Sequence, residues 1–338
     1  MYHYELLRQL TPTDEQAITG FLQTCPGFHY FQSPVFFKVC QASDRLEPFY
    51  IIARQANKLV GVLLAYRQLQ LGLPVIRLLS SRNLIIGGPV VADNNASIVQ
   101  GLLETYQTSG LKSLYTQVRN FQDTSPLQSV FERAGFQYDD HLNILVDLTC
   151  SEDELWRYVH TKRRNEIRRA EKEGCLVTLT KEPEALARCY DILTEVYQRA
   201  KLPLPSYSHF DAIRQQSTEH AGLRLFTAVW EGQIIGCMIC LAYGDTLYDY
   251  YAGAYSRYYS KYPNDLLPWA VFKWAKENGF SRFDFGGAGK PNVPYGVREY
   301  KKKFGGSVVN YGRYELNHYP LLLALATRLF ALWKVAKR

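Results

Sequence analysis

One pattern occurs twice in this sequence, in the same order, and it constrains the fold more than any other feature. Residues 53–61 read ARQANKLVG and residues 228–236 read AVWEGQIIG, each between apolar runs. A turn residue flanked by apolar runs is typical of a β-hairpin. In both halves a helix-like stretch then leads through a glycine, Gly110 or Gly279, into a strand-like stretch. Two ordered matches predict an internal duplication.

The repeated pattern predicts an α/β (α+β) protein of two tandem domains, with mixed sheets flanked by helices. We expect a first domain over 1–150, a second over 151–318 and an amphipathic C-terminal helix over 319–338. Helices are expected near 13–24, 34–41, 94–109, 125–134, 152–173, 182–200, 207–220 and 264–278. Strands are expected near 3–9, 48–54, 58–69, 74–79, 111–119, 143–149, 175–180, 223–230, 233–243, 247–254, 281–286 and 306–315.

Composition excludes several classes of protein. Of the 338 residues 47% are hydrophobic and 21% are charged, which is typical of a globular protein and not of a disordered one. No apolar run approaches the ~20 residues that cross a bilayer, and the first 16 residues lack the apolar region of a secretory signal. Seven scattered cysteines fit free thiols in a reducing compartment. We therefore expect a cytoplasmic protein.

Positive charge is concentrated in a chain whose formal net charge is +7. Three short segments, 161–172, 298–303 and 328–338, have a combined net charge of +11, so the rest of the chain is net −4. Such clustering predicts local anion-binding sites more than a general coat for nucleic acid. A solvated helix face is the alternative for each segment taken alone.

The expected helix over 152–173 places an arginine on an apolar face. Its residues at three- or four-residue steps are Trp156, Val159, Arg163, Ile167 and Ala170. A buried guanidinium needs a carboxylate, a ligand anion or access to water, because an unpaired charge in a core is costly. Arg164, Arg168 and Lys172 form a neighbouring stripe that suits phosphate or carboxylate. A salt bridge within the protein suits this stripe equally well, and both interpretations stay open.

Segment 284–306, DFGGAGKPNVPYGVREYKKKFGG, is the other unusual stretch. Its GGAGK is not a phosphate-binding loop, because the earlier glycine and the following Ser or Thr are missing. The glycines instead suit close approach of a ligand or a neighbouring strand. Cys237 and Cys240 lie in an apolar strand pattern, so we expect core packing and no metal site. An enzyme without a metal, an organic cofactor or an evident nucleophile would position two substrates for direct transfer.

Two further segments leave two interpretations each. The tyrosine-rich run over 248–265 either lines a cleft or packs in the core. The tail PLLLALATRLFALWKVAKR has the composition of an interfacial helix, which would give the protein a peripheral contact with the inner membrane. Docking of this tail on the protein's own core is the alternative.

Three stretches resemble the FemABX group of peptidoglycan interpeptide-bridge aminoacyltransferases and the related BioF2-like acyltransferases. They are FQSPVFF (31–37), RRNEIRRAEKEG (163–174) and YGVREYKKKFGG (295–306), in which Tyr300 stands where phenylalanine is usual. The sequence departs from its relatives twice. The coiled-coil arm that some members use for tRNA is absent, and residues 253–265, GAYSRYYSKYPND, lack the loop with which ordinary GNAT enzymes hold CoA.

The resemblance implies two tandem GNAT-like (acyl-CoA N-acyltransferase-like) domains and transfer of an aminoacyl or acyl group to an amine of a peptidoglycan-precursor-like acceptor. It implies no bound cofactor, a phosphate-bearing cell-envelope precursor as partner, and aminoacyl-tRNA or acyl-CoA as co-substrate. Lys301 falls on the family's reaction-centre lysine, and Arg164 on the basic position associated with the acceptor's anionic groups. The alternatives are a CoA-dependent acyltransferase acting on a sugar or small-molecule amine, and a non-catalytic module that binds RNA or a membrane.

Amide formation adds roles to these residues. The oxyanion that develops needs a cation or hydrogen-bond donor, and we expect Lys301 to supply it. Arg163, Arg164 and Arg168 are expected to hold the phosphate-bearing substrate, and Asp284 is a candidate to accept the amine's proton. Tyr295 and Tyr300 are expected to contact the substrate. No metal ligand is expected.

Overall fold

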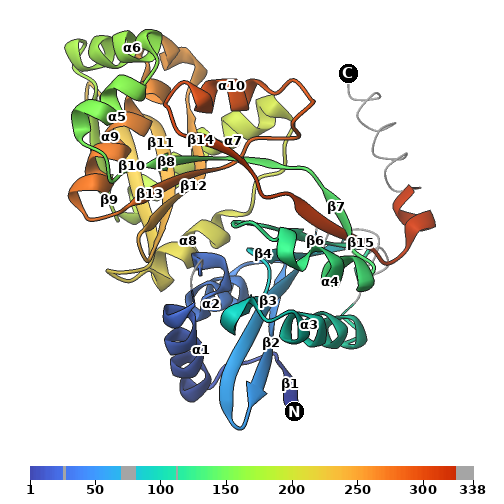
Figure 1. Ribbon diagram of the computed structural model, residues 1–338. Coiled ribbons are helices and arrows are strands. Elements are labelled where there is room, and N and C mark those ends of the chain that lie inside the picture. Colours follow the sequence, from blue (N-terminus) through green and yellow to red (C-terminus); the bar gives the residue numbers. More distant parts are fainter. Residues whose placement is uncertain (26–27, 70–80, 112, 325–338) are drawn as a thin grey trace. The chain divides into compact units, whose positions relative to one another are not determined.

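The protein was studied as a computed structural model, which describes residues 1–25, 28–69, 81–111 and 113–324. The chain forms two compact units, each with a mixed sheet covered by helices (Figure 1). Unit 1 comprises Met1–Asp140 and the chain from Tyr311 onward, and unit 2 comprises His141–Asn310. No described helix has the length and apolar character needed to span a membrane.

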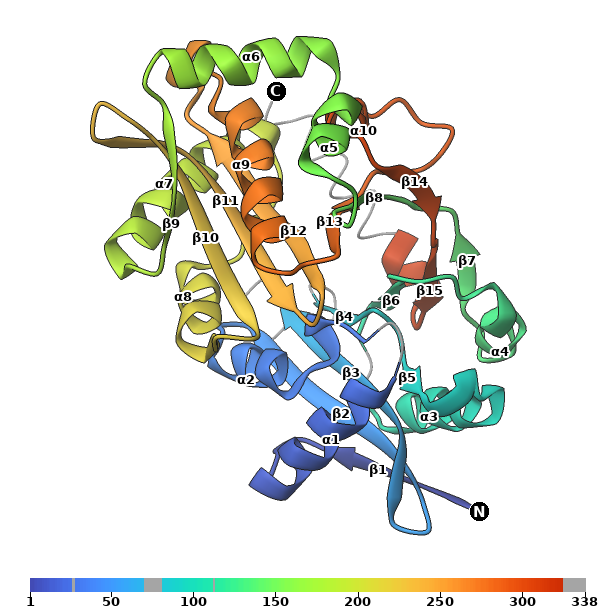
Figure 2. The same ribbon diagram turned by 60° about the vertical axis from the view of Figure 1, so that its left-hand side comes forward.

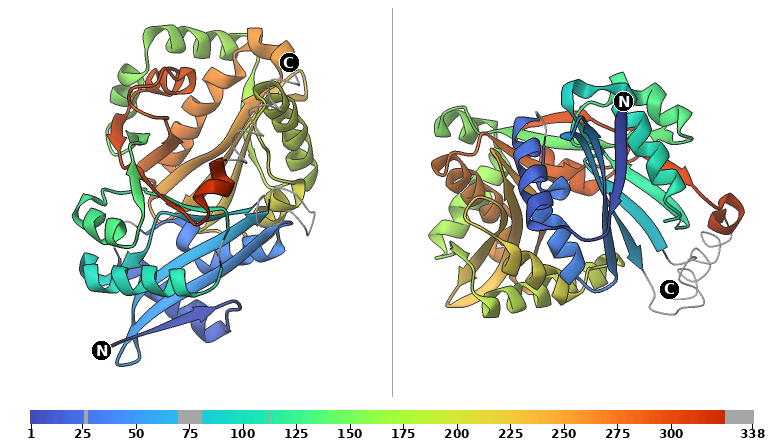
Figure 3. Two further views of the ribbon diagram at one scale, coloured as in Figure 1. Left: turned by 90° about the vertical axis from the view of Figure 1, so that its right-hand side faces the viewer. Right: turned by 90° about the horizontal axis from the view of Figure 1, so that it is seen from below.

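Unit 1 contains a sheet with eight strands among its described residues, in the order β1-β2-β3-β4-β6-β15-β7, with β5 beside β3. β1 lies at one edge (Figure 3), and β4 and β6 are parallel. Helices α3 and α4 contribute to the larger core on one face, while Phe37 of α2 stacks on Tyr50 on the other. The strands are β1 (Tyr2–Leu7), β2 (Leu46–Gln55), β3 (Lys58–Leu69), β4 (Ser81–Ile86), β5 (Val90–Val91), β6 (Tyr115–Arg119), β7 (Gln137–Asp139) and β15 (Arg313–Asn317). The helices are α1 (Pro12–Thr24), α2 (Pro34–Ala42), α3 (Ala96–Thr108) and α4 (Gln128–Arg133).

Unit 2 has a seven-stranded sheet in its described residues, in the order β14-β8-β13-β12-β11-β10-β9. Only the β12–β13 pair in it is parallel. The strands are β8 (Leu142–Asp147), β9 (Leu176–Thr180), β10 (Gly222–Trp230), β11 (Gln233–Tyr243), β12 (Thr246–Ala254), β13 (Arg282–Gly287) and β14 (Ser307–Asn310). The helices are α5 (Glu152–Tyr158), α6 (Thr161–Lys172), α7 (Pro183–Ala200), α8 (Tyr207–Gln216), α9 (Pro263–Glu277) and α10 (Gly296–Lys302). α6 packs beside α9, and α7 with α8 covers the opposite face (Figure 2).

The predicted duplication is present in the two hairpins. β2–β3 and β10–β11 turn at Ala56–Asn57 and Glu231–Gly232, all with positive φ, as a tight hairpin turn requires. Each hairpin has a bulge at the equivalent point, after Ala53 in unit 1 and after Ala228 in unit 2. In each unit the hairpin is followed by a strand, a helix and a strand parallel to the first. Each turn lies one residue earlier than the pair that the sequence pattern indicates, which is Asn57–Lys58 in the first hairpin and Gly232–Gln233 in the second.

The unit boundaries differ from the expected domain boundaries because two strands cross over. The strand expected at 143–149 is β8, which pairs with β13 and β14 in the sheet of unit 2. The single strand expected at 306–315 is interrupted at Tyr311 and Gly312, where Gly312 has a φ of 65°. Its first part is β14 of unit 2 and its second part is β15, which pairs with β6 and β7 of unit 1.

The single helix expected over 152–173 is two helices. α5 ends at Tyr158, the backbone is extended at Val159, and α6 begins at Thr161 with the His160 side chain accepting the N–H of Lys162. The N–H of His160 donates to the carbonyl of Lys303 instead of continuing a helix. Val159 therefore lies in the break, while Ile167 and Ala170 of α6 remain buried.

Some elements were not expected from the sequence, and some expected ones cannot be compared. β4 and α10 were missed, because glycine and proline stand beside both. The strand expected at 74–79 and most of the helix expected at 319–338 lie outside the described residues.

Candidate active site

The candidate active site lies in unit 2, where β12 and β13 stop pairing. The two parallel strands are in register only over Thr246–Tyr248 and Arg282–Asp284. The equivalent pair in unit 1, β4 and β6, stays in register over five residues. Beyond Tyr248 and Asp284, the backbone N–H and C=O groups of β12 and β13 no longer pair with each other and are open to other partners.

Glycine permits the turn at this point. Gly286 has a φ of 69°, and a Cβ there would lie 2.9 Å from the hydroxyl of Tyr248 on β12. The expectation that these glycines allow close approach of a neighbouring strand is confirmed for Gly286.

Lys301 of α10 supplies a cation at the end of β13. Its Nζ donates to the carbonyl oxygen of Phe285 and, at 3.2 Å, to that of Gly287. Burial lowers the pKa of the Lys301 ammonium, and the carboxylates of Asp249 and Asp284 oppose that shift. These contacts fix a partly buried cation beside two carboxyl groups.

The two carboxyl groups differ in their surroundings. Asp284 is 5% exposed, accepts the N–H of Gly286 at 2.6 Å and is also bonded by the Asn143 side chain. Asp249 of β12 is partly buried and accepts no hydrogen bond from the described residues. Burial raises the pKa of each to about 6, and Lys301 limits both shifts. Near neutral pH both groups are mostly ionised, yet each binds a proton more readily than an ordinary carboxylate does.

A small pocket adjoins Asp249. It has a volume of about 30 Å³, which is room for a water molecule or the end of a substrate group. Its lining combines the apolar side chains of Met238, Ala252, Leu267 and Phe285 with the polar groups of Asp249 and Tyr300.

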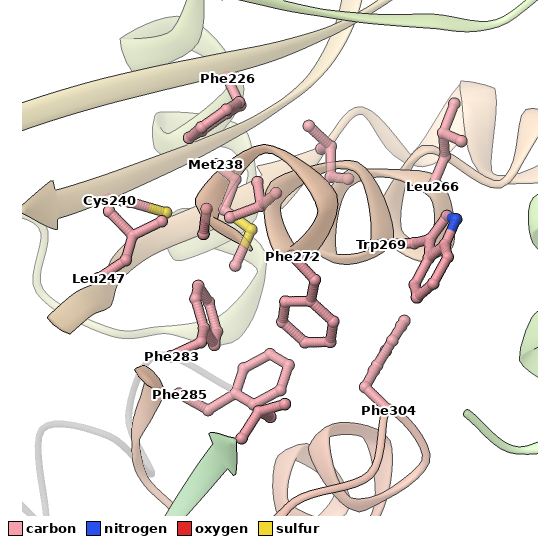
Figure 4. Close-up of a cluster of buried hydrophobic side chains, with 14 of the residues drawn as sticks. Phe226, Met238, Cys240, Leu247, Leu266, Trp269, Phe272, Phe283, Phe285 and Phe304 are labelled. Carbon is pink, nitrogen blue, oxygen red and sulfur yellow. The ribbon is translucent and has the colours of Figure 1, made fainter. Parts of the chain in front are cut away.

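A rigid aromatic core supports this site. Phe272, Phe283, Phe285 and Phe304 pack with ring centroids 4.8–6.4 Å apart, mostly edge to face (Figure 4). Phe285 precedes the glycines of the turn and Phe304 follows α10, so both ends of the lysine-bearing segment are anchored. Buried aromatic pairs of this kind stabilise by ~0.5–1.5 kcal/mol beyond their area.

The predicted arginines have different surroundings. Arg163 donates to Glu166 at 2.9 Å and to Asp265 in the first turn of α9, and its guanidinium lies 5.3 Å from the Tyr300 ring centroid. The sequence predicted a carboxylate, a ligand anion or water as the partner of the Arg163 guanidinium, and the structure provides carboxylates. Arg164 donates to the hydroxyl of Thr161 at 3.1 Å. Arg168 is exposed, and its guanidinium lies 5.4 Å from the ring centroid of Trp156.

Of the two predicted tyrosines, Tyr300 lies in α10 and Tyr295 directly precedes it. The Tyr300 hydroxyl donates to the carbonyl of Asn264, which accounts for tyrosine at a position where phenylalanine is usual in the FemABX-type pattern. Tyr295 precedes α10 and is 41% exposed. Tyr300 and Lys301 therefore belong to one cluster with Arg163, Asp249 and Asp284. Arg164 and Arg168 contact Thr161 and Trp156 instead, and Tyr295 is exposed.

Two residues of this region were not found from the sequence. Asp249 is hidden in the run YDYYAGAY, whose only signal is an acid among aromatic residues. Arg298 donates to the carbonyls of Ala288, Lys290 and Val293 and so fixes the loop before α10.

The tyrosine-rich run mostly packs. The Tyr250 hydroxyl pairs with His209 at 2.7 Å, and the Tyr251 ring packs against Phe210 at 5.1 Å. Both rings therefore lie on the α7 and α8 face of the sheet. Cys237 and Cys240 are buried, free thiols, as expected for core residues.

The start of α9 is poorly suited to the diphosphate of CoA. Helix N-termini bind phosphate through free N–H groups and their positive end. Here the first helical residue is Pro263, the N–H of Asp265 already donates to Tyr262, and the Asp265 carboxylate occupies the first turn. The preceding residues form a short 3-10 helix, Ser256–Lys261, without glycine. We therefore derive no step through CoA.

Comparison with known proteins agrees with this architecture. Residues 159–302 match the family described as Acetyltransferase (GNAT) domain. FemX aligns with 95% of this chain and 99% of its own at 15% identity and a TM-score of 0.73. L-PGS from Bacillus licheniformis aligns with 99% of both chains at 15% identity and a TM-score of 0.61. A tandem GNAT protein from the clavulanic acid biosynthesis pathway covers 93% of this chain and 98% of its own, at 11% identity and a TM-score of 0.58. A search of curated proteins finds no match.

The chain thus has a tandem GNAT fold, and residues 159–302 of its second unit match a GNAT acetyltransferase domain. The predicted fold class and the acyltransferase class are confirmed. The resemblance to FemABX-type proteins is confirmed in the fold, which FemX shares.

Proposed function

We propose that this chain is an N-acyltransferase of FemABX type, which transfers an aminoacyl or acyl group to an amine of a peptidoglycan-precursor-like acceptor by direct attack. The observation that supports it best is the Lys301 cation, fixed beside two carboxyl groups and a pocket where β12 and β13 diverge. The fold shared with FemX agrees with this assignment.

Lys301 is the cation proposed to stabilise the oxyanion of the transition state. An ammonium group has three N–H donors, and two of them donate to the carbonyls of Phe285 and Gly287. The third remains for the oxyanion that forms when the amine attacks the acyl carbonyl. One such donor contributes about 2.7–4 kcal/mol to transition-state stabilisation.

Two arginines outside this cluster would hold the charged portion of the substrate. Arg164 and Arg168 are the proposed contacts to a phosphate-bearing acceptor, because neither is engaged by a carboxylate in the described residues. Arg163 is the proposed support of the site through Asp265 and Tyr300. Tyr295 would contact the substrate from the exposed side of α10.

An aminoacyl ester, such as aminoacyl-tRNA, is the preferred donor. The carboxylate in the first turn of α9 disfavours the diphosphate of acyl-CoA. A CoA-dependent transferase acting on a sugar or small-molecule amine remains the second candidate, since the matching family is described as an acetyltransferase. One structural relative is named a putative lysylphosphatidylglycerol synthetase from Agrobacterium fabrum, so lysine is tested first among the amino acids.

The test is a transfer assay with two donors and two acceptors. Purified protein is given lysyl-tRNA or acetyl-CoA, together with a UDP-linked muropeptide precursor or glucosamine, and the amide product is measured by mass spectrometry. We expect product from the aminoacyl donor and the muropeptide, and none with Lys301→Ala. Product from acetyl-CoA alone would replace the proposal by the second candidate.

A non-catalytic RNA- or membrane-binding module is the candidate of another class. Arg257 lies 4.0 Å from the Tyr255 ring centroid, and Lys261 lies 4.3 Å from that of Trp230. Such pairs suit stacking on bases or an anionic surface. Binding that falls steeply with salt, with no turnover from any donor, would favour this candidate. The predicted contact of the C-terminal helix with the inner membrane falls mostly on residues outside those described.

A further inference from the structure

Of the two carboxyl groups beside Lys301, only one faces the pocket. Asp284 is almost completely buried and its Oδ1 is occupied by the N–H of Gly286. Asp249 lines the pocket, and its oxygens accept no hydrogen bond from the part of the chain that the structure describes. Asp284 therefore supports the turn before α10, while Asp249 has acceptor capacity for a ligand.

Regular alternation along β12 places Asp249 on the same face of the sheet as the core residue Leu247, and a bulge follows it. Asp249 pairs with Cys240 and Tyr251 pairs with Ile239, which leaves Tyr250 as the extra residue. In a regular strand, residues 249 and 252 would point to opposite faces. With the bulge between them, Asp249 and Ala252 both line the pocket, next to the core position of Leu247. An acid thus occupies a place where the strand pattern calls for an apolar side chain.

The charges around Asp249 favour a cationic or N–H-rich ligand. Asp249 interacts electrostatically with Lys301 of α10 and Asp284 of β13, and the three groups together have a net charge of −1 when ionised. The other titratable groups that face Asp249 are neutral near pH 7: Tyr197 of α7, Tyr300 of α10 and Cys240 of β11. An entering ammonium or amine meets an unsatisfied acceptor and a compensating charge.

We propose that the pocket beside Asp249 receives the primary amine of the acceptor and that Asp249 is the group that takes its proton. This rests on the proposed N-acyl transfer. As the nitrogen of the neutral amine bonds to the acyl carbonyl carbon, one N–H proton passes to an Asp249 oxygen. The bond from that carbon to the donor's ester oxygen then breaks, and the departing oxygen takes the proton from Asp249. The products are the amide and the donor's free hydroxyl, and Asp249 is returned as a carboxylate.

Binding of a simple amine probe tests the site without turnover. The probe is Nα-acetyl-lysine amide, and Nα-acetyl-norleucine amide is its matched control without the terminal amine. Titration calorimetry compares the wild type with Asp249→Asn and with Asp191→Asn, an exposed helix position outside the site. We expect the lysine probe to bind more tightly than the norleucine probe, with ~10-fold or greater weakening in Asp249→Asn and no change in Asp191→Asn.

A second measurement uses the carboxyl groups themselves. In protein labelled with ¹³C at the aspartate carboxyl carbons, the signal lost in Asp249→Asn identifies Asp249. The lysine probe should move the midpoint of this signal's titration to lower pH, because a nearby cation favours the ionised form. Equal binding of the probe by Asp249→Asn and the wild type, or no preference over norleucine, overturns the inference.

Failure of the proposed function is seen separately. If no donor yields product while amine binding stays dependent on Asp249, the amine site stands and the FemABX-type reaction does not. If transfer is observed and Asp249→Asn retains it within threefold, the reaction stands and the role of Asp249 is wrong.

Discussion

Arg163 of α6 forms an ion pair with Asp265 in the first turn of α9, with side-chain exposures of 16% and 7%. Burial raises the pKa of Asp265 to about 6 although Arg163 opposes that shift. Since Asp265 lies in the first turn of α9, which covers the sheet, and Arg163 also contacts the Tyr300 ring, this pair links three helices around the candidate site.

Arg163→Leu should lower the free energy of unfolding by ~3–5 kcal/mol, because it leaves the Asp265 carboxylate buried without its partner. Urea denaturation measures this change. Arg168→Leu is the matched control on the same helix, and its exposed side chain predicts a change within ~0.5 kcal/mol. Equal losses in both variants would contradict the structural role given to Arg163.

Lys301→Met should reduce kcat by ~10²–10³ with little change in KM, since the side chain keeps most of its apolar length and loses the cation that meets the oxyanion. Steady-state kinetics of the transfer assay measures the two constants. Lys302→Met, one residue along α10 and exposed, should leave both unchanged. Turnover of Lys301→Met within a few-fold of the wild type would rule out the role of Lys301 in stabilising the oxyanion.

Asp284 should make the protein less stable as pH rises. Burial raises the pKa of Asp284 from its ordinary 3.8 to about 6 in the folded protein, so protonation favours the folded state between these values. The advantage of Asp284→Asn over the wild type in unfolding free energy should therefore grow from pH 4 to pH 6 and then stay level. Urea denaturation at pH 4, 5, 6 and 7 measures it.

Asp147→Asn is the control of opposite sign for this experiment. Hydrogen bonds from Thr149 lower the pKa of Asp147 below 3.8, so its contribution to stability is lost only at lower pH. Between pH 4 and pH 7 the difference from the wild type should be flat. A flat difference for Asp284→Asn as well would show that its pKa is not raised.

Gly286→Ala should destabilise the protein by ~1–2 kcal/mol, because an L-residue is strained at positive φ and its Cβ would contact the Tyr248 hydroxyl. In the double variant with Tyr248→Phe, part of this loss should be recovered, since the nearest atom is removed. Thermal unfolding of the four proteins of this cycle measures the coupling. Strictly additive effects would indicate that backbone strain alone opposes the alanine.

The duplication and most strands of unit 2 could be predicted because they are local patterns. The hairpin over 223–243 turns at Glu231 and Gly232, which adopt the positive φ that the turn needs. The break at Val159 could not be predicted, because the N–H of His160 donates to Lys303, which is more than 140 residues away in sequence. A contact of that range leaves no periodic signal.

The candidate site was predicted in part for the same reason. Lys301 and Tyr300 lie in a recognisable stretch, and Asp284 lies in a clear strand. Asp249 was missed because an acid stands where alternation from Leu247 calls for an apolar side chain, and the bulge at Tyr250 that brings Ala252 to the same face has no signature in the run YDYYAGAY.

The return of β15 to the sheet of unit 1 has a consequence for biosynthesis. This strand lies between β6 and β7, so that sheet stays incomplete until residue 317 has left the ribosome, whereas unit 2 is one uninterrupted stretch. A nascent chain can thus finish its second unit before its first, and a fragment cut at residue 140 would expose two strand edges to aggregation.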